Sequence, residues 1–521
     1  MKSYINHLKT TSSFLQDINL KQKPVFRSSA IFPCICNKDL ETNILFLGYW
    51  FIKKKIREVT VLITLRDKKG SIIYRKSLLV NEVKSYRICI KEILNTINFK
   101  LNFNGSIEIE VFSSKNLIFP YPAVVVNYFS KQSCSFVHST SRTYNDVEDS
   151  VVNNELIVPE SGIDILPQKD FLPFISFVNG PLFESNKIIQ FEIFNIEGKS
   201  FKKKIIIKNL KPFETKFLFF LKEREKLFLK EKKGTVKIYH NFKNFFPRFL
   251  SGNIKKDKKV SSLTHTYYDQ SFQKKAYWKN PDVKNLYDSI STFPVFNKGL
   301  SYTELVLYPI YPKSRMKFDL EFYNIEGKLL KKINSIYLIK KKLDRPVYLN
   351  INKYLNYKEF SDEQLFAKLV IDGEGKLPTR LKFGLNLGRP KEYDIPSNIC
   401  FSAAEPNDKI LKKPGTFKWG LLVNKKKSSF ILSNFSFCRN GFRKANINIK
   451  FWRETDNSFI SRKILINDNG SYFFYLNKNN KIKSFIGKGS SWVTFESDNP
   501  FLNGWYLEDM QNGIIGADHL F

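Results

Sequence analysis

The sequence predicts an all-β protein made of four tandem β-sandwich domains of about 128 residues each. Two observations predict this class. A polar turn recurs along the 521 residues, with Gly70, Gly198, Gly327 and Asn457 at intervals of 128, 129 and 130 residues. The apolar residues before these turns also alternate with period two, as half-buried strands do. The interval is much longer than the about 20 to 50 residues of a solenoid or propeller repeat, so each repeat should be a domain with its own core.

The strand before each turn shows the alternation most clearly. In residues 59–65, every second residue is apolar, and residues 316–322 and 445–451 follow the same rule. The Gly or Asn that comes next can adopt positive φ, which reverses the chain into a hairpin. We therefore expect Asn457 to take the conformation of the three glycines.

The rest of the repeat also recurs. An apolar run follows each turn, at residues 77–80, 205–207, 336–339 and 464–466. The next strand is expected at 86–90, 216–221, 347–351 and 472–476. Glycine introduces a later strand at 105–109, 234–238 and 489–493. Seven or eight short strands per repeat are typical of an immunoglobulin-like or a jelly-roll sandwich, and both remain open. Helices are expected only as short turns in connections.

The repeat register also predicts the domain boundaries. An N-terminal lead covers residues 1–25. Four β-sandwich repeats follow, at residues 26–158, 159–281, 282–405 and 406–521. The polar stretches 141–150 and 398–409 are predicted linkers. They are short, so neighbouring sandwiches should touch in a bent rod or a pair of pairs.

The formal charge of +36 allows two interpretations. A basic surface can bind nucleic acid, an anionic glycan or a membrane surface. Alternatively, abundant Lys, Asn, Ile and Phe reflect an AT-rich genome, and lysines placed at strand ends or in hairpins protect sheet edges from pairing with other chains. The lysine runs are residues 53–55, 202–204, 340–342 and 425–427. In either case weak, salt-sensitive binding to polyanions is expected.

The termini and the cysteines indicate a cytoplasmic protein. The chain begins without an apolar signal region, and no stretch of about 18 apolar residues could span a membrane. The six cysteines occupy no common position in the repeats, whereas the cysteines of a disulfide framework would recur with each repeat. Cys34 and Cys36 share one apparent strand face, which is expected to be core rather than a metal or redox site.

Polar residues near the end of each repeat are the first candidate site. Asn127, Asn253, Asn386 and Asn499 are each predicted to close the glycine-introduced strand, and His138, His265 and His519 follow in three repeats. In one interpretation Asn forms an Asx turn and His packs at the domain junction. In the other, each junction forms a polar ligand pocket. One His per repeat is too few for zinc unless neighbouring repeats contribute together, so no metal or other cofactor is expected.

The C-terminal tail is the second candidate site. It gathers Trp505, Tyr506, Glu508, Asp509, Asp518 and His519 within a short segment. Aromatic faces beside carboxylates suit a sugar, and two carboxylates about 5 to 10 Å apart could hydrolyse a glycosidic bond. The alternative is a terminal strand whose aromatic residues are core and whose acids face water.

The sequence thus favours a non-enzymatic binding or scaffold protein whose ligand is a glycan or another anionic polymer, with a protein as a further candidate partner. No phosphate-binding glycine loop, nucleophile elbow or His-Glu-x-x-His motif is present. Two alternatives remain. One is a carbohydrate-active enzyme, or a subunit of one, with its site in the last repeat. The other is a non-specific nucleic-acid-binding protein.

Overall fold

The computed structural model describes most of the chain that follows the predicted N-terminal lead. The described residues are 26–115, 117, 123–138, 141, 159–166, 170–242, 248–257, 259–269, 277–278, 285–296, 302–312, 314–355, 364–375, 377–378, 381–389, 393–403, 408–511 and 513–521. The lead 1–25 and most of the predicted linker 141–150 lie outside them. No helix in this described part is long and apolar enough to cross a membrane.

The first two repeats are almost entirely strands. The first contains β1 (Phe26–Cys36), β2 (Glu41–Leu47), α2 (Tyr49–Lys54), β3 (Val59–Asp67), β4 (Ile72–Val80), β5 (Ser85–Cys89), α3 (Ile90–Thr96), β6 (Phe103–Ser113), β7 (Val124–Phe129) and β8 (Cys134–Val137). The second contains β9 (Glu160–Ile165), β10 (Phe171–Val178), β11 (Glu184–Asn195), β12 (Ser200–Leu210), β13 (Thr215–Phe219), α4 (Glu223–Leu229), β14 (Gly234–His240), β15 (Leu250–Lys255), β16 (Ser261–His265) and β17 (Tyr267–Tyr268).

The last two repeats follow the same plan. Between the second and third lies β18 (Tyr277–Trp278). The third contains β19 (Ser289–Val295), β20 (Tyr302–Leu307), β21 (Met316–Tyr323), β22 (Leu329–Ile339), β23 (Val347–Asn350), the 3-10 helix η1 (Ile351–Tyr354), β24 (Leu365–Gly373), β25 (Leu377–Pro378), β26 (Lys382–Arg389) and β27 (Tyr393–Ser402). The fourth contains α6 (Asp408–Leu411), β28 (Thr416–Leu422), β29 (Lys427–Asn434), β30 (Ala445–Trp452), β31 (Phe459–Ile466), β32 (Ser471–Tyr475), η2 (Leu476–Lys478), α7 (Asn480–Ile486), β33 (Ser491–Ser497), β34 (Leu502–Asp509) and β35 (Gly516–His519).

One strand order occurs four times along the chain. In the first repeat the two antiparallel sheets have the orders β1-β6-β3-β4 and β5-β2-β7-β8, and each later repeat uses the same order. In the second repeat β17 adds a fifth strand, and β18 pairs with β25 in a separate ribbon. The prediction of an all-β sandwich protein is confirmed. The order differs from that of an immunoglobulin domain, because β1 and β2 lie in different sheets here, whereas the first two immunoglobulin strands pair.

Each pair of sheets encloses apolar side chains supplied by the period-two pattern. In β30, Ile447, Ile449 and Phe451 are buried, whereas Asn446 is exposed. In the second repeat, Phe191 of β11 stacks on the Phe220 ring beyond β13, with 4.9 Å between ring centroids. Burial of these side chains is the main stabilising term in each sandwich.

The predicted hairpin turns are present, but the fourth differs from the other three. Gly70, Gly198 and Gly327 have φ of 92°, 86° and 88°. Asn457 is not among the described residues with positive φ, so the expectation that it copies the glycines is wrong. The Asp456 carboxylate accepts the Ser458 N–H at 2.9 Å, as Asp67 accepts the Lys69 N–H at 2.9 Å in the first turn. The fourth turn therefore keeps the side-chain acceptor but not the positive φ.

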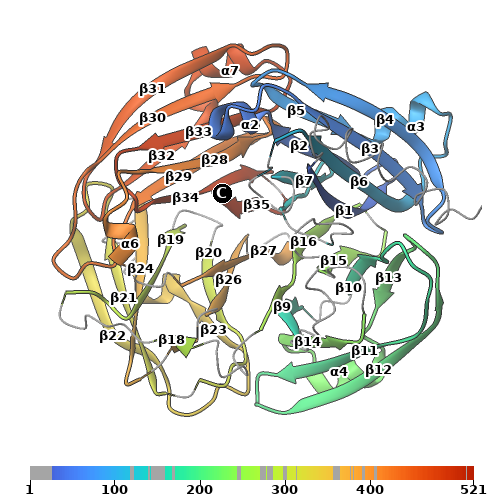
Figure 1. The fold of residues 1–521 in the computed structure, drawn as a ribbon. Coiled ribbons are helices and arrows are strands. Elements are labelled where there is room, and N and C mark those ends of the chain that lie inside the picture. The colour runs from blue at the N-terminus through green and yellow to red at the C-terminus, as the bar shows by residue number, and fades with distance from the viewer. Residues whose placement is uncertain are drawn as a thin grey trace, which may run out of the picture.

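Neighbouring repeats dock through these hairpins. Three backbone hydrogen bonds join a hairpin to the first residue of the fifth strand of the next repeat: Thr215 N–H to Lys68 O at 3.1 Å, Ser471 N–H to Ile325 O at 3.0 Å and Ser85 N–H to Arg453 O at 3.0 Å. The third of these connects the last repeat to the first. The four repeats therefore form a closed ring with the C-terminus near its centre (Figure 1), and not the expected rod or pair of pairs.

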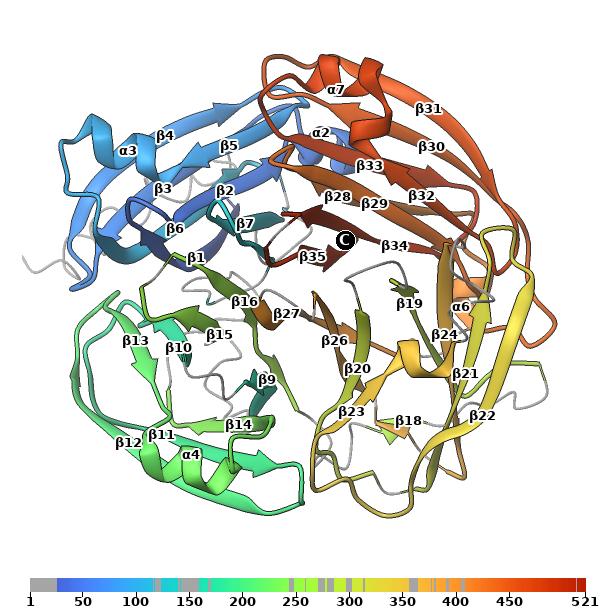
Figure 2. The same ribbon diagram turned by 180° about the vertical axis from the view of Figure 1, so that it is seen from behind.

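Seen from behind, the third and fourth strands of each repeat lie on the outer wall of the ring (Figure 2). The lysine run 202–204 lies in β12, an edge strand, as the edge-protection interpretation expects. Residues 53–55 do not lie at a strand end or in a hairpin, because they cover the end of α2 and its C-cap. The domain boundaries after residues 158, 281 and 405 fall in or beside segments outside the described residues and stay predictions.

Candidate functional site

The last strand of each repeat faces the centre of the ring (Figure 1). Hydrogen bonds tie these strands to one another around the centre: Leu263 N–H to Ser135 Oγ at 3.0 Å, Ser262 Oγ to Pro396 O at 2.7 Å and Ile514 N–H to Gln132 O at 2.8 Å. Residues 128 or more positions apart are thereby brought together. This geometry places equivalent residues of different repeats at one site.

The three predicted histidines meet at this centre. His138 Nε2 lies 3.2 Å from His265 Nε2, and the ring centroids of His138 and His519 are 4.8 Å apart. The Asp518 carboxylate accepts a hydrogen bond from His138 Nδ1 at 2.8 Å. In the third repeat Phe401 occupies the neighbourhood and contacts Trp505, with 5.4 Å between centroids. Of the described residues, the group that could hold a metal ion is therefore His138, Asp518 and His519, with His265 against His138.

The environment keeps two of these imidazoles neutral. Burial lowers the pKa of His519 to about 4, although the Asp518 carboxylate opposes the shift. Burial, followed by the charges of His138 and Arg248, lowers the pKa of His265 well below its usual value. Neutral imidazoles carry an unshared electron pair on one ring nitrogen, which can bind a proton or a metal ion.

A cavity of about 650 Å³ lies beside the histidines, between the third and fourth repeats. This volume is within the range of small-molecule sites. Its aromatic and histidine lining consists of Phe401, Phe417, Phe435, Phe437, Phe501, Trp505, His519 and Phe521. Two residues of the predicted C-terminal site, Trp505 and His519, are thus in the cavity wall.

The charged residues that line this cavity are all basic. They are Lys53, Lys413 and Lys418, and no Asp or Glu is among the described lining residues. The Lys53 ammonium lies over the Phe417 ring, 4.3 Å from its centroid. Burial and then the positive charge of Lys53 lower the pKa of Lys418. Adjacent ammonium groups without a lining carboxylate favour an anionic occupant.

The Trp505 side chain in the lining is buried, and its indole Nε1–H has no acceptor among the described residues. The nitrogen itself is buried, so Trp505 contributes apolar ring surface to the lining.

The other predicted tail residues lie elsewhere. Glu508 is fully buried, where its carboxylate accepts from Ser428 Oγ and the Lys426 N–H. Asp509 pairs with Arg389 of the third repeat. Tyr506 is buried, and its hydroxyl is 3.5 Å from Asp518 Oδ2. The interpretation that these acids face water is therefore wrong for Glu508 and Asp518, because both are buried in polar networks.

The repeated asparagines are buried at the repeat junctions, but three of them do not close the glycine-introduced strand. Asn127, Asn253 and Asn386 lie inside the following strands β7, β15 and β26, which corrects the predicted position. Only Asn499 forms the expected Asx turn, because its Oδ1 accepts the Phe501 N–H at 2.9 Å. Buried amides in a strand must bond to side chains or to backbone beyond the ladder.

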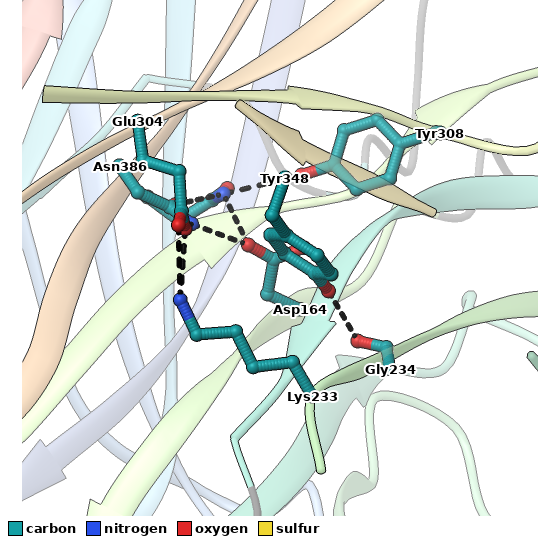
Figure 3. Close-up of polar contacts among 8 residues, drawn as sticks. Asp164, Lys233, Gly234, Glu304, Tyr308, Tyr348 and Asn386 are labelled. Atoms are coloured by element: carbon teal, nitrogen blue, oxygen red, sulfur yellow. Dashed lines mark hydrogen bonds and ion pairs between the residues drawn. The ribbon is translucent and has the colours of Figure 1, made fainter. Parts of the chain in front are cut away.

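The Asn386 side chain makes its hydrogen bonds in a network between the second and third repeats (Figure 3). Its Nδ2 donates to Asp164 Oδ2 at 2.9 Å and to Glu304 Oε1 at 3.1 Å. Lys233 of the second repeat pairs with Glu304 at 2.9 Å, and the Tyr348 hydroxyl donates to Gly234 O at 2.9 Å. These contacts join the two repeats and lie apart from the residues of the central cavity.

Sequence reasoning missed Lys413 and Lys418, and it did not assign Lys53 of the lysine run 53–55 or Phe401 to this site. Each lies far along the chain from the C-terminal tail, and the cavity forms only when the third and fourth repeats pack together. The loss of His from the third repeat was the one visible signal for Phe401.

The comparisons with known proteins add little. No family model matches the chain, and no curated protein matches it. Among solved structures, a calcium-binding mutant of Bacteroides uniformis β-glucuronidase 2 is 9% identical over 48% of this chain and 27% of that chain, with a TM-score of 0.12. The match spans about a quarter of that protein's length. A likeness of this size carries no argument about fold or function.

Proposed function

We propose that the protein is a non-enzymatic binding protein whose central cavity holds an acidic sugar, or the acidic end of an anionic glycan. The observation that carries the proposal is the lining of the 650 Å³ cavity, which combines aromatic side chains with three lysines and no described acid. Aromatic faces stack on the C–H faces of a sugar ring, and ammonium groups pair with its carboxylate or sulfate.

The carbohydrate-active enzyme is less well supported. Hydrolysis by the usual mechanism needs two carboxyl groups about 5 to 10 Å apart beside the bound sugar. Glu508 and Asp509 are engaged by Ser428 and Arg389 and are not among the residues that line the cavity. The nucleic-acid alternative rests on net charge alone, which predicts binding that salt abolishes.

Calorimetric titration of the full chain with a matched pair of ligands tests the proposal. The pair is a uronic-acid oligosaccharide and the same oligosaccharide with its carboxyl groups reduced to alcohols. We expect the acidic form to bind at least about tenfold more tightly, a difference of about 1.4 kcal/mol. Lys418→Gln should remove most of this preference.

Lys204→Gln is the matched control, because Lys204 is an exposed lysine of β12 outside the cavity. It removes the same charge and should leave the preference unchanged. Equal affinity for the two oligosaccharides, or equal effects of the two substitutions, would contradict the proposal. Product formation from the acidic oligosaccharide, lost in Glu508→Gln or Asp509→Asn, would support the enzyme instead.

A further inference from the structure

The hydrogen bonds of the central histidines determine where their protons lie. In each ring Nδ1 faces a fixed oxygen: Asp518 Oδ2 for His138 at 2.8 Å, Thr266 O for His265 at 2.7 Å and Leu520 O for His519 at 3.0 Å. Carbonyl and carboxylate oxygens can only accept, so each Nδ1 carries a proton. A neutral imidazole has one ring proton, so with that proton on Nδ1 the Nε2 atom carries an unshared electron pair.

Two of these electron pairs face each other. His138 Nε2 and His265 Nε2 are 3.2 Å apart, and neither has a proton to donate while both rings are neutral. Such a contact needs a proton or a metal ion between the two nitrogen atoms. Nitrogen ligands at about 2.0 to 2.1 Å from a tetrahedral ion lie roughly 3.3 Å from each other, close to the observed separation.

The surroundings match those of metal-binding histidines. His ligands generally donate their other ring N–H to a carboxylate or a backbone carbonyl, which fixes the tautomer and the ring orientation. All three rings do so here. Candidate ligand atoms of His138, Asp518 and His519 also lie within 4.8 Å of one another.

We propose that His138, His265 and His519 bind one divalent transition-metal ion. His138 and His265 would bind it through their facing Nε2 atoms, and His519 and Asp518, whose candidate ligand atoms lie within 4.8 Å of that of His138, complete the site. Three repeats each supply one ligand, and the third supplies Phe401 in place of a fourth histidine. Three imidazoles and one position open to another ligand suit zinc, copper or nickel rather than calcium or magnesium, which prefer oxygen.

Zinc titration of the chelator-treated full chain is the test. We expect one zinc ion per chain in competition with a chromophoric chelator. Cobalt(II) added to the same wild-type protein should give the intense visible absorption of a four-coordinate site. The cobalt spectrum needs no substitution, so it remains informative if a variant folds poorly.

His265→Gln and His519→Gln should each weaken zinc binding by more than about 100-fold, and Asp518→Asn by about 10- to 100-fold. His240→Gln is the matched control, since His240 is a largely buried histidine of β14 with no part in the cluster. It should bind zinc as the wild type does.

Two results would overturn the proposal. One is absence of stoichiometric zinc binding and of the cobalt spectrum. The other is zinc affinity that is the same in the two cluster variants and in His240→Gln. Absence of zinc binding would mean that a proton, and not a metal ion, lies between the two Nε2 atoms.

Discussion

At the scale of single residues, the junction between the second and third repeats contains an acid with an unusual proton affinity. Burial raises the pKa of Asp164 to about 7, with Glu304 acting in the same direction and the Asn386 hydrogen bond opposing it. Asp164 Oδ2 also accepts from Asn398 Nδ2 at 3.2 Å. The folded protein therefore favours the protonated form of a group that is ionised at pH 7 when the chain is unfolded.

This pKa predicts how stability depends on pH. Between its ordinary value of 3.8 and about 7, the folded state binds a proton at Asp164 that the unfolded state does not. The free energy of unfolding should therefore decrease as pH rises through this window, by up to about 1.4 kcal/mol per pH unit from this group, and level off above it. Asp164→Asn, which is neutral at every pH, should remove this contribution.

Urea denaturation of both proteins at pH 5 and pH 8 measures the difference. The difference in the free energy of unfolding, Asp164→Asn minus wild type, should be more positive at pH 8 than at pH 5. Asp257→Asn is the control, because Asp257 is an exposed carboxylate with an ordinary turn contact to the Lys259 N–H. If the two variants show the same pH dependence, Asp164 is ionised in the folded protein.

At the scale of elements, the recurring hairpin has two roles. Gly70 and Gly327 need positive φ, and both also lie against the next repeat, where an added Cβ would be 2.2 Å from Pro212 O or Asp468 O. The turn was predicted from backbone geometry alone. Its second role as a docking surface depends on the neighbouring repeat and leaves no local pattern.

A pair of glycine substitutions separates these two roles. Gly327→Ala meets both the φ of 88° and the Asp468 carbonyl, whereas Gly198→Ala, in the equivalent turn of the second repeat, meets a φ of 86° with only the Asp344 carboxylate nearby, at 3.4 Å. Positive φ alone costs about 1 kcal/mol or slightly more. Gly327→Ala should therefore lower the free energy of unfolding by clearly more than Gly198→Ala. Equal losses in denaturant titrations would show that the docking contact adjusts without cost.

The strands were largely predictable, and the reason is physical. A strand with one buried face imposes alternation on its own residues, so 59–65, 316–322 and 445–451 revealed β3, β21 and β30 directly. The ring was not predictable, because backbone atoms make its contacts, between residues 146, 147 and 368 positions apart. Backbone hydrogen bonds place little restriction on side-chain identity.

The candidate site was predictable in part. His138, His265 and His519 stood at one register of the repeat, and the closed ring brings equal registers to one point. Trp505 was found as an aromatic residue in the tail. Lys418 was missed because the sequence has many lysines and does not show which of them lack a neighbouring carboxylate in the fold. Glu508 was predicted as a ligand-binding residue, but its carboxylate is buried and already accepts a hydrogen bond from Ser428 Oγ.

At the scale of the whole molecule, the ring supports both proposed sites. The cavity has walls from the third and fourth repeats plus Lys53 of the first, and the histidines come from the first, second and fourth. Neither set of residues converges in a single repeat. Contacts that close the ring should therefore affect binding at a distance from the ligand.

The contact between the fourth and first repeats offers a direct test. Ser85 Oγ donates to Trp452 O at 2.7 Å and accepts the Trp492 N–H at 2.7 Å, and all three residues are buried. Ser85→Ala leaves a buried donor and a buried acceptor unsatisfied, so a loss of about 1 to 3 kcal/mol is expected for each group. Hydrogen exchange at the Trp492 amide should accelerate accordingly.

Ser200→Ala is the control for this change, since Ser200 Oγ makes an exposed hydrogen bond to Glu192 at 3.3 Å. It should alter neither stability nor exchange at Trp492. If the ring is held by this contact, Ser85→Ala should also weaken zinc binding at the histidines, although it touches none of them. Unchanged exchange at Trp492 together with unchanged zinc affinity would mean that the remaining contacts, such as the Arg87–Glu454 pair at 3.2 Å, close the ring without Ser85.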